Sequence, residues 1–348
     1  MIIYDDIPTL DLVAHELHEL FGIRDVRSVD LLRGGYLCKN FIIETHADRF
    51  FLKQYRHKLS QVVSQIKFAE SFFASQGAPV LLPMSDGYGR SAFLMGQNWY
   101  SLFPFHNAQT KNLSELGSRE VRLLGEQLAQ LHRAGAGISD QIQPLLLWDK
   151  NRFDLEVVEI ERALNRQPRL NRIEQMIKQM LEKKKRFVSN QDSCRGRTLP
   201  YDTLLHGDFG YQNVFFSEDG ERIESIFDFE KTARGPRAYE LARSLFVNCF
   251  EDGWEQKNID LAVEFLTAYY KQYPLSLEEF QLGVCLYLTN LAHQTWVEGK
   301  VLLKKSLDYL DLLETHARRI DHLTDDIDAL SVTIFQRATR TETATSLP

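Results

Sequence analysis

Three polar side chains lie close together in one stretch of the chain. Asp208 follows His206 and Gly207, Asn213 comes five residues after Asp208, and Asp228 comes twenty residues after it. Phosphoryl transfer from ATP uses such groups: a carboxylate that orients the attacking hydroxyl and accepts its proton, and oxygen ligands for the Mg²⁺ that neutralises the phosphates. Because Mg²⁺ prefers oxygen ligands and keeps several waters, two protein ligands suffice. We therefore interpret Asp208 as the base and Asn213 and Asp228 as magnesium ligands.

Short apolar segments should hold these residues at one edge of a β-hairpin. Residues 203–205 indicate a strand before the loop, residues 214–216 the next strand, and residues 223–227 a third that ends at Asp228. The polar turn 217–220 joins the last two strands. An ordinary hairpin in which Asp and Asn merely favour turns has the same pattern. This segment alone leaves that alternative open.

An earlier part of the chain offers two further groups that this chemistry uses. Phosphoryl transfer of the protein-kinase type needs a strand Lys for the ATP phosphates and a helix Glu that holds the Lys. Lys53 lies in an aromatic run, residues 49–55, which forms a predicted hairpin with residues 40–45. Glu70 borders the apolar face of a helix predicted over residues 60–76. We interpret Lys53 and Glu70 as that pair; a surface Lys and a solvated Glu are the simpler alternative.

Two adjacent glycines, Gly34 and Gly35, lie one predicted strand upstream of Lys53, where a turn covering the phosphates would lie. They do not form a G-x-G-x-x-G pattern, so they are weak evidence for nucleotide binding. The chain contains no G-x-x-x-x-G-K-[ST] sequence, and this absence closes the P-loop route to phosphate binding.

The order of the predicted elements indicates an α+β fold. Strands and one helix in residues 1–103 make a small N-terminal lobe with an antiparallel sheet, which we expect to bind the nucleotide. After Pro104 the pattern is mainly helical, starting with the apolar stripe of residues 114–134. We expect residues 104–330 to form a larger catalytic and substrate-binding lobe. Residues 337–348 are Thr-rich and lack apolar periodicity, so we expect a disordered tail there.

With these residues, the chain resembles the superfamily of small-molecule kinases that includes aminoglycoside phosphotransferases, choline kinases and homoserine kinases, from about residue 25 to residue 325. The resemblance rests on four features: His206-Gly207-Asp208 with Asn213, Phe227-Asp228-Phe229-Glu230, the Lys53 and Glu70 pair, and residues 128–132. It implies a bilobal protein-kinase-like fold that binds ATP and Mg²⁺ between its lobes. It also implies that the backbone around Phe103 is the adenine hinge.

Histidines near these motifs invite a catalytic interpretation, but simpler roles fit them. We interpret His206 as a brace of the loop and His132 as a packed residue of a helix. Residues 15–19 read His-Glu-Leu-His-Glu, which lacks the second His of the zinc motif H-E-x-x-H. We therefore expect no zinc site.

The stretch after Asp228 bears on the acceptor of the phosphate. Residues 228–234 run directly into Gly235, Pro236 and a predicted helix, which leaves no room for the long activation loop of protein kinases. We therefore expect a small alcohol as acceptor: an amino alcohol, an amino acid, a sugar or an aminoglycoside.

The residues that would contact the acceptor are less well defined by sequence. We expect them in residues 148–152, at Tyr239 and in residues 290–296. Aromatic and acidic groups there would suit a cationic alcohol, although core packing is the simpler role for a Trp. Two other functions stay open: a non-catalytic kinase-like binding protein, and an atypical protein Ser/Thr kinase.

Composition narrows the partners and the compartment. The net charge is −7 and the basic residues are dispersed, which disfavours a nucleic-acid partner. No segment approaches the roughly 20 apolar residues that span a bilayer, and the acidic N-terminus does not read as a signal peptide. Four widely separated cysteines predict no disulfide framework. We expect a cytoplasmic protein without a membrane partner, and a homodimer stays open.

Overall fold

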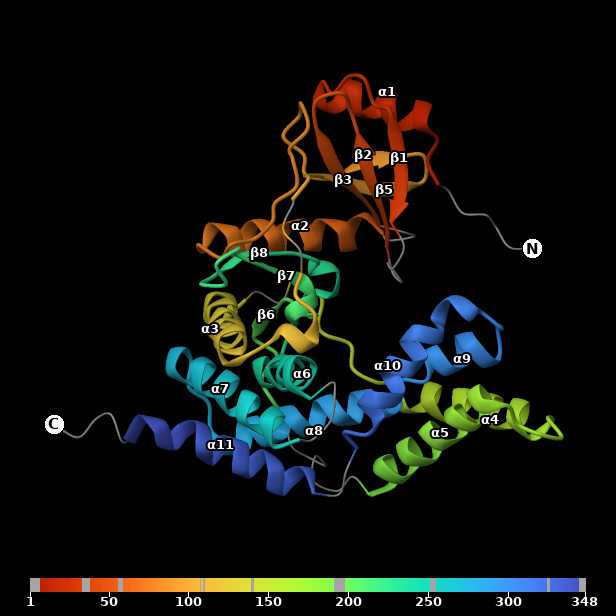
Figure 1. The fold of residues 1–348 in the computed structure, drawn as a ribbon, viewed down its shortest axis with the longest axis vertical. Coiled ribbons are helices and arrows are strands. Elements are labelled where there is room, and N and C mark those ends of the chain that lie inside the picture. Colours follow the sequence, from red (N-terminus) through yellow and green to blue (C-terminus); the bar gives the residue numbers. More distant parts are fainter. Residues whose placement is uncertain are drawn as a thin grey trace.

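The computed structural model describes residues 7–32, 38–55, 59–106, 108, 110–138, 141–190, 198–250, 255–323 and 326–343. An antiparallel sheet with two helices forms the N-terminal lobe, and a larger, mostly helical lobe lies below it (Figure 1). This arrangement confirms the predicted α+β fold. No helix in the described ranges is long and apolar enough to cross a membrane.

The N-terminal sheet has five antiparallel strands in the order β1-β2-β3-β5-β4. Their bounds are β1 Ser28–Leu32, β2 Lys39–Glu44, β3 Arg49–Tyr55, β4 Phe93–Met95 and β5 Asn98–Pro104. The predicted hairpin is confirmed, with Ile42 opposite Phe51. Alternate residues of β2, Phe41 and Ile43, are fully buried, because successive side chains point to opposite faces of a strand. Lys53 lies in the middle of the sheet, opposite Ser101 of β5.

Two helices cover the two faces of this sheet. Helix α1 (Leu10–Phe21) buries Val13 and Leu17 in a small core with the sheet. Helix α2 (Ser60–Ser75) lies between the sheet and the C-terminal lobe (Figure 1). The Phe73 ring of α2 packs 5.8 Å from the Phe229 ring of the C-terminal lobe. Helix α2 therefore packs in the apolar core of the C-terminal lobe, which is separate from the small core between α1 and the sheet.

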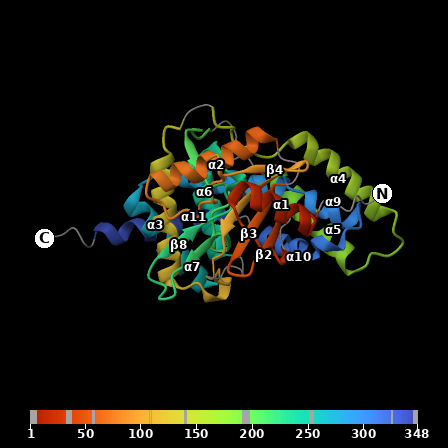
Figure 2. The same cartoon turned by 90° about the horizontal axis from the view of Figure 1, so that it is seen from above.

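The C-terminal lobe is built mainly of helices. They are α3 Ser118–Gly135, α4 Lys150–Asn165, α5 Arg172–Asn190, α6 Arg237–Cys249, α7 Gln256–Gln272, α8 Leu277–His293, α9 Trp296–Leu302, α10 Leu310–Ile320 and α11 Ile327–Thr343. Helices α4 and α5 lie at one end of this lobe and α11 at the opposite end (Figure 2). Helix α6 packs against α7 and α8 in the middle, and its residues from Ser244 to Cys249 are all buried.

Two short antiparallel sheets lie between the lobes and carry the predicted site residues. In one, β6 (Thr203–Leu205) pairs with β9 (Ala233–Gly235). In the other, β7 (Val214–Phe216) pairs with β8 (Ile223–Ile226). Strands β6, β7 and β8 confirm the strands predicted over residues 203–205, 214–216 and 223–227, except that β8 ends at Ile226. Strand β9 is an element that the sequence pattern did not predict.

Two predictions from sequence are wrong. The tail expected from residue 337 is helical up to Thr343, because Phe335 and Ala338 of α11 are buried; residues 344–348 lie outside the described residues. Cys285 takes part in a disulfide bond, although Cys38 and Cys249 are free thiols. Spacing along the chain does not reveal which cysteines the fold brings together.

The close approach of α3 and α7 yields a stability prediction. A Cβ on Gly125 of α3 would overlap the carbonyl oxygen of Phe265 on α7. We expect Gly125→Ala to lower the free energy of unfolding by about 1–3 kcal/mol, because overpacking forces the helices apart. Gly299→Ala is the matched control, since a Cβ there meets nothing within 4 Å; it should be neutral or stabilise by up to about 1 kcal/mol. Equal urea midpoints for the two variants would contradict this packing.

Candidate active site

Strand β6 leads directly into the loop that carries Asp208. The loop turns at Gly207, whose φ is +85° and whose absent side chain makes room for the Lys231 carbonyl. This positive φ and the close contact both require glycine. The motif therefore contains glycine because two chain segments touch at the turn that presents Asp208.

A buried carboxylate on α6 holds this loop from below. Glu240, only 1% exposed, accepts hydrogen bonds from the backbone N–H groups of His206 (3.0 Å) and Gly207. It also bonds Nε2 of His132 on α3 (3.0 Å), whose Nδ1 lies 2.9 Å from the Tyr269 hydroxyl. Burial works to raise the pKa of Glu240, but hydrogen bonding and the charge of His132 outweigh it, so this pKa is lowered. The loop is thus fixed to two helices by one ionised group.

His206 braces the same loop from inside. Its ring is fully buried against Phe229, with 4.3 Å between ring centroids. Nε2 lies 3.0 Å from the Phe227 carbonyl and Nδ1 accepts from the Asp208 backbone N–H at 3.2 Å, which fixes the Nε2–H tautomer. Burial lowers the pKa of His206. A neutral, enclosed ring fits the bracing role inferred from sequence.

Two cations contact the Asp208 carboxylate. Oδ2 accepts a hydrogen bond from the Lys231 ammonium at 2.9 Å, and Oδ1 accepts one from the Arg243 guanidinium. Sequence reasoning missed both. Two spacings were available as signals. Lys231 follows Asp228 by three residues. Arg243 follows Glu240 by three residues on one helix, so Glu240 and Arg243 lie on the same helix face.

Asp228 meets the Lys of the N-terminal lobe. Lys53 Nζ lies 2.8 Å from Asp228 Oδ1 and 2.7 Å from Glu230 Oε1. Burial works to raise the pKa of Asp228, but the Lys53 charge outweighs it and lowers this pKa to about 2. Burial works to lower the pKa of Lys53, but Asp228 and Glu230 raise it well above its ordinary value. Both groups are therefore charged at neutral pH.

Asn213 and Asp228 present the kind of oxygen atoms that Mg²⁺ binds. The backbone N–H of Phe227, the residue before Asp228, donates to the Asn213 backbone carbonyl at 3.0 Å. This bond holds Asn213 next to the segment that carries Asp228. The Asn213 amide donates through Nδ2 to the Asp208 carbonyl at 2.9 Å, which leaves its Oδ1 for a metal. Asp228 has the left-handed backbone conformation, φ 67° and ψ 57°, and a side chain 34% exposed. The donor set fits a magnesium ion shared with phosphate oxygens.

A family model agrees with this geometry. The model of the phosphotransferase enzyme family, APH, matches residues 28–280. The chain belongs to this family. No curated protein matches its sequence.

Solved structures of the same fold are distant in sequence. Spectinomycin phosphotransferase APH(9)-Ia, in complex with ADP and spectinomycin, is 14% identical with a TM-score of 0.69, over 95% of this chain and 99% of that one. A microcompartment-associated aminopropanol kinase is 14% identical with a TM-score of 0.60, over 94% and 100%. An ethanolamine kinase of Plasmodium vivax is 12% identical with a TM-score of 0.56, over 92% and 90%. At this identity they show the fold alone.

One residue of this family member is not paired as the sequence suggested. Glu70 is bonded to Lys67 on its own helix, with 2.8 and 3.0 Å between Lys67 Nζ and the two carboxylate oxygens, and the ion pairs of Lys53 go to Asp228 and Glu230 instead. Residues three apart are neighbours on a helix surface, so Glu70 pairs with Lys67 rather than with Lys53. Burial raises the pKa of Glu70 and lowers that of Lys67.

The expected nucleotide contacts are described only in part. Gly34 and Gly35 lie outside the described residues. Phe103 lies near the end of β5, where it is buried and packs edge-on against the Phe51 ring at 6.1 Å. Sequence reasoning missed an aromatic stack just beyond β5, in which the His106 ring lies 5.0 Å from that of Phe215. The ring of Phe227, next to Asp228, lies 4.6 Å from the Phe215 ring.

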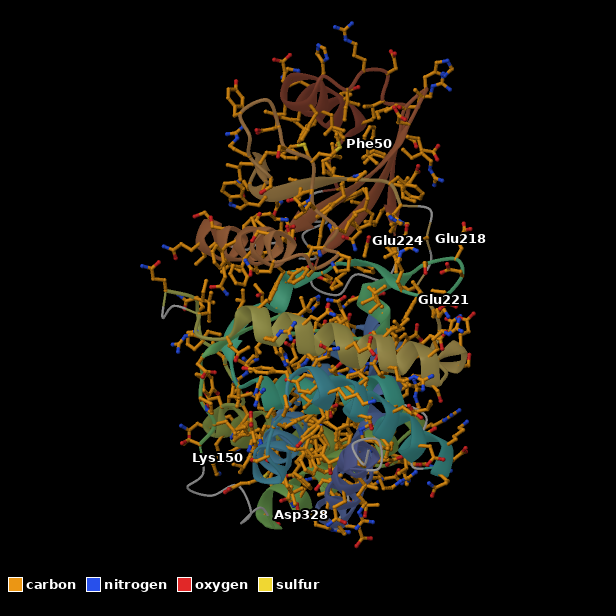
Figure 3. All side chains as sticks on the ribbon, turned by 90° about the vertical axis from the view of Figure 1, so that its left-hand side faces the viewer. Phe50, Lys150, Glu218, Glu221, Glu224 and Asp328 are labelled. Atoms are coloured by element: carbon orange, nitrogen blue, oxygen red, sulfur yellow. The ribbon has the colours of Figure 1, made fainter. Side chains whose placement is uncertain are left out.

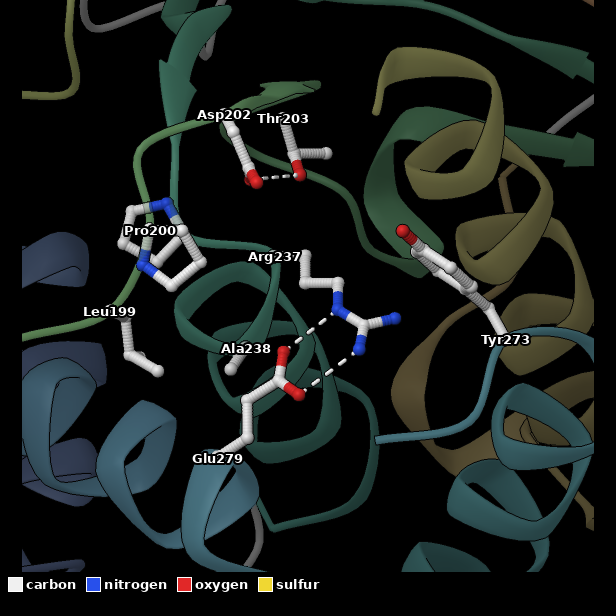
Figure 4. Close-up of a pocket in the computed structure, with 9 residues that line it drawn as sticks. Leu199, Pro200, Asp202, Thr203, Arg237, Ala238, Tyr273 and Glu279 are labelled. Carbon is white, nitrogen blue, oxygen red and sulfur yellow. Dashed lines mark hydrogen bonds and ion pairs between the residues drawn. The ribbon is translucent and has the colours of Figure 1, made fainter. Parts of the chain in front are cut away.

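Two cavities lie in different parts of the C-terminal lobe and differ in size. One of about 700 Å³, a size usual for ligand pockets, lies between His106 and the β7–β8 turn. Figure 3 shows Glu218 and Glu224 of this cavity beneath the N-terminal sheet. The other, about 210 Å³, lies at the start of β6 and α6. There Arg237 makes a two-pronged ion pair with Glu279 (2.8 and 3.0 Å; Figure 4), so its charges are already matched.

The Glu240 contacts yield a second prediction. Glu240→Gln replaces one acceptor oxygen by an NH₂ group that faces a buried donor. We expect it to lower the free energy of unfolding by about 1–3 kcal/mol, the cost of an unsatisfied buried group. Glu221→Gln, which removes an exposed ion pair with Arg119, is the control and should cost less than about 1 kcal/mol. A Glu240→Gln variant as stable as this control in urea unfolding would show that the carboxylate does not fix the loop.

Proposed function

We propose that the protein transfers the γ-phosphate of ATP to a hydroxyl group of a small molecule. One observation carries this proposal: Asp208, Asn213 and Asp228 are brought together with Lys53, which comes from a separate lobe. An ordinary hairpin would not need that Lys. Residues 1–103 would form the nucleotide lobe, and residues 104–330 the catalytic and acceptor lobe.

In this mechanism the chain mainly positions charge. Asp208 orients the acceptor hydroxyl and accepts its proton as the oxygen attacks the γ-phosphorus; the bond to the β-phosphate oxygen breaks and ADP leaves. Lys53 moves from Asp228 to the phosphates. Magnesium, held by Asn213 and Asp228, would neutralise the phosphate charge. The carboxylate of Asp228, with its pKa of about 2, is ready to bind the metal at neutral pH.

The short connection after Asp228 supports a small acceptor. Only eight residues lie between Asp228 and the first residue of α6, Arg237, and β9 takes up three of them. A protein substrate would need a docking platform, which the activation loop supplies in protein kinases. Aminopropanol and ethanolamine, named for two structural neighbours, are small amino alcohols and set the size of acceptor that we expect.

The expected acceptor residues are placed as follows. The Tyr239 hydroxyl accepts a hydrogen bond from Asn290 at 2.8 Å. The Trp148 ring stacks on His293 at 5.3 Å, and Trp296 packs edge-on against Tyr309. Each of these groups already has a packing partner, so we propose them as walls of the acceptor region rather than as its charged contacts.

Substitutions of the two carboxylates separate chemistry from binding. Asp208→Asn should lower the rate of phosphate transfer by about 10²–10⁴-fold, the usual contribution of a positioned base, while ATP still binds. Asp228→Asn should remove the Mg²⁺-dependent part of ATP affinity. Asp328→Asn, at the far end of the molecule (Figure 3), should change neither.

Isothermal titration with ATP, with and without Mg²⁺, and an ADP-release assay measure these effects. An affinity for ATP that changes neither with Mg²⁺ nor with Asp228→Asn would contradict the proposal. It would favour a non-catalytic binding protein.

A further inference from the structure

The carboxylate proposed as the base contacts two cations that differ in exposure. Asp208 has one negative charge and contacts two cations, Lys231 and Arg243. Arg243 is only 15% exposed and also donates to the Phe209 carbonyl at 3.3 Å. It is built into the loop, whereas the Lys231 side chain is 48% exposed. Lys231 is therefore the cation of this pair that an incoming acceptor can reach.

Lys231 is placed to meet a second ligand. Its side chain is 48% exposed, although its ammonium lies on Asp208. An ammonium on a flexible stem has three donors, so it can bond another anion without leaving the carboxylate. Burial lowers the pKa of Lys231, the charge of Asp228 raises it, and the charge of Arg319 on α10 lowers it.

The carboxylates around this loop are already engaged. Glu240 is turned toward His132 and the backbone of the loop. Asp228 and Glu230 both bond Lys53. An amine-bearing alcohol brought to Asp208 would thus meet Lys231 before it found a carboxylate among these. The charges favour the opposite kind of acceptor.

We propose that the acceptor is an anionic alcohol, whose carboxylate or phosphate group is received by the Lys231 ammonium beside Asp208. This inference rests on the proposed phosphotransfer at Asp208 and names its substrate class. It departs from the amino alcohols that the names of the structural neighbours would suggest.

Matched pairs of alcohols test the charge preference with the whole protein, Mg²⁺ and ATP. Glycerate is compared with 3-amino-1,2-propanediol, and gluconate with glucosamine; glycerol 3-phosphate distinguishes a phosphate from a carboxylate. We expect kcat/KM to favour the anionic member of a pair by about tenfold or more, the effect of one charge-assisted contact. Preference for the amines, equal use of both charges, or no turnover of any anionic alcohol in this set would overturn the inference.

Substitutions at Lys231 test the residue itself. Lys231→Met should raise KM for the preferred anionic alcohol about tenfold or more and leave KM for ATP within about twofold. Lys231→Glu should shift the preference toward the amines. Arg318→Met, at an exposed neighbour of Arg319, is the control and should change neither constant. A lower kcat with unchanged KM for every alcohol would place Lys231 on the transferred phosphate and overturn its role toward the acceptor.

These results are separable from the proposed function. Mg²⁺-dependent ATP binding that Asp228→Asn removes would support the nucleotide site even if the amines proved the better acceptors. Absence of Mg²⁺-dependent ATP binding would instead contradict the proposed phosphotransferase function itself.

Discussion

The site depends on one buried carboxylate, that of Glu240. Its two oxygens receive backbone N–H groups of the Asp208 loop and the ring of His132. A buried charge costs several kcal/mol unless it is paired and hydrogen-bonded. These hydrogen bonds offset that cost for Glu240. The same bonds attach the loop to α3 and α6, so it does not behave as a free surface turn. The position of Asp208 is therefore set by the core of the C-terminal lobe.

The second constraint joins the lobes. Lys53 lies in the middle of the five-stranded sheet, yet its ion pairs are with Asp228 and Glu230 of the other lobe. The Phe73 and Phe229 rings add an apolar contact behind those charges. Because Asp228 and Phe229 are neighbours in sequence, one short segment carries both the polar and the apolar contact between lobes. Movement of one lobe against the other must change both together.

The sequence predicts most of the scaffold and the central residues. The aromatic, β-branched runs around Lys53 and the apolar stripe of α2 are local patterns, and local geometry alone produces a hairpin and a helix from them. Asp208, Asn213 and Asp228 could be found because their spacing is fixed by one loop and one hairpin. The contact of Arg243 with Asp208 depends on how α6 packs beneath the loop, and that of Lys231 on the turn after Asp228. Spacing along the chain does not give either arrangement by itself.

The errors have different physical origins. Glu70 was assigned to Lys53 on the analogy of the protein-kinase pair, but Lys67, one helical turn before it, is the closer cation. The tail was judged by composition, whereas Phe335 and Ala338 find a buried surface on the folded lobe. A neighbour on the same helix decides the partner of Glu70, whereas a tertiary contact decides where α11 ends.

The most direct test is a crystal structure of the protein with Mg²⁺ and a non-hydrolysable ATP analogue. The account predicts a metal bound by Asn213 Oδ1 and the Asp228 carboxylate, Lys53 on the phosphates, and the γ-phosphate facing Asp208. A nucleotide bound away from Lys53, or a metal held by neither Asn213 nor Asp228, would contradict it.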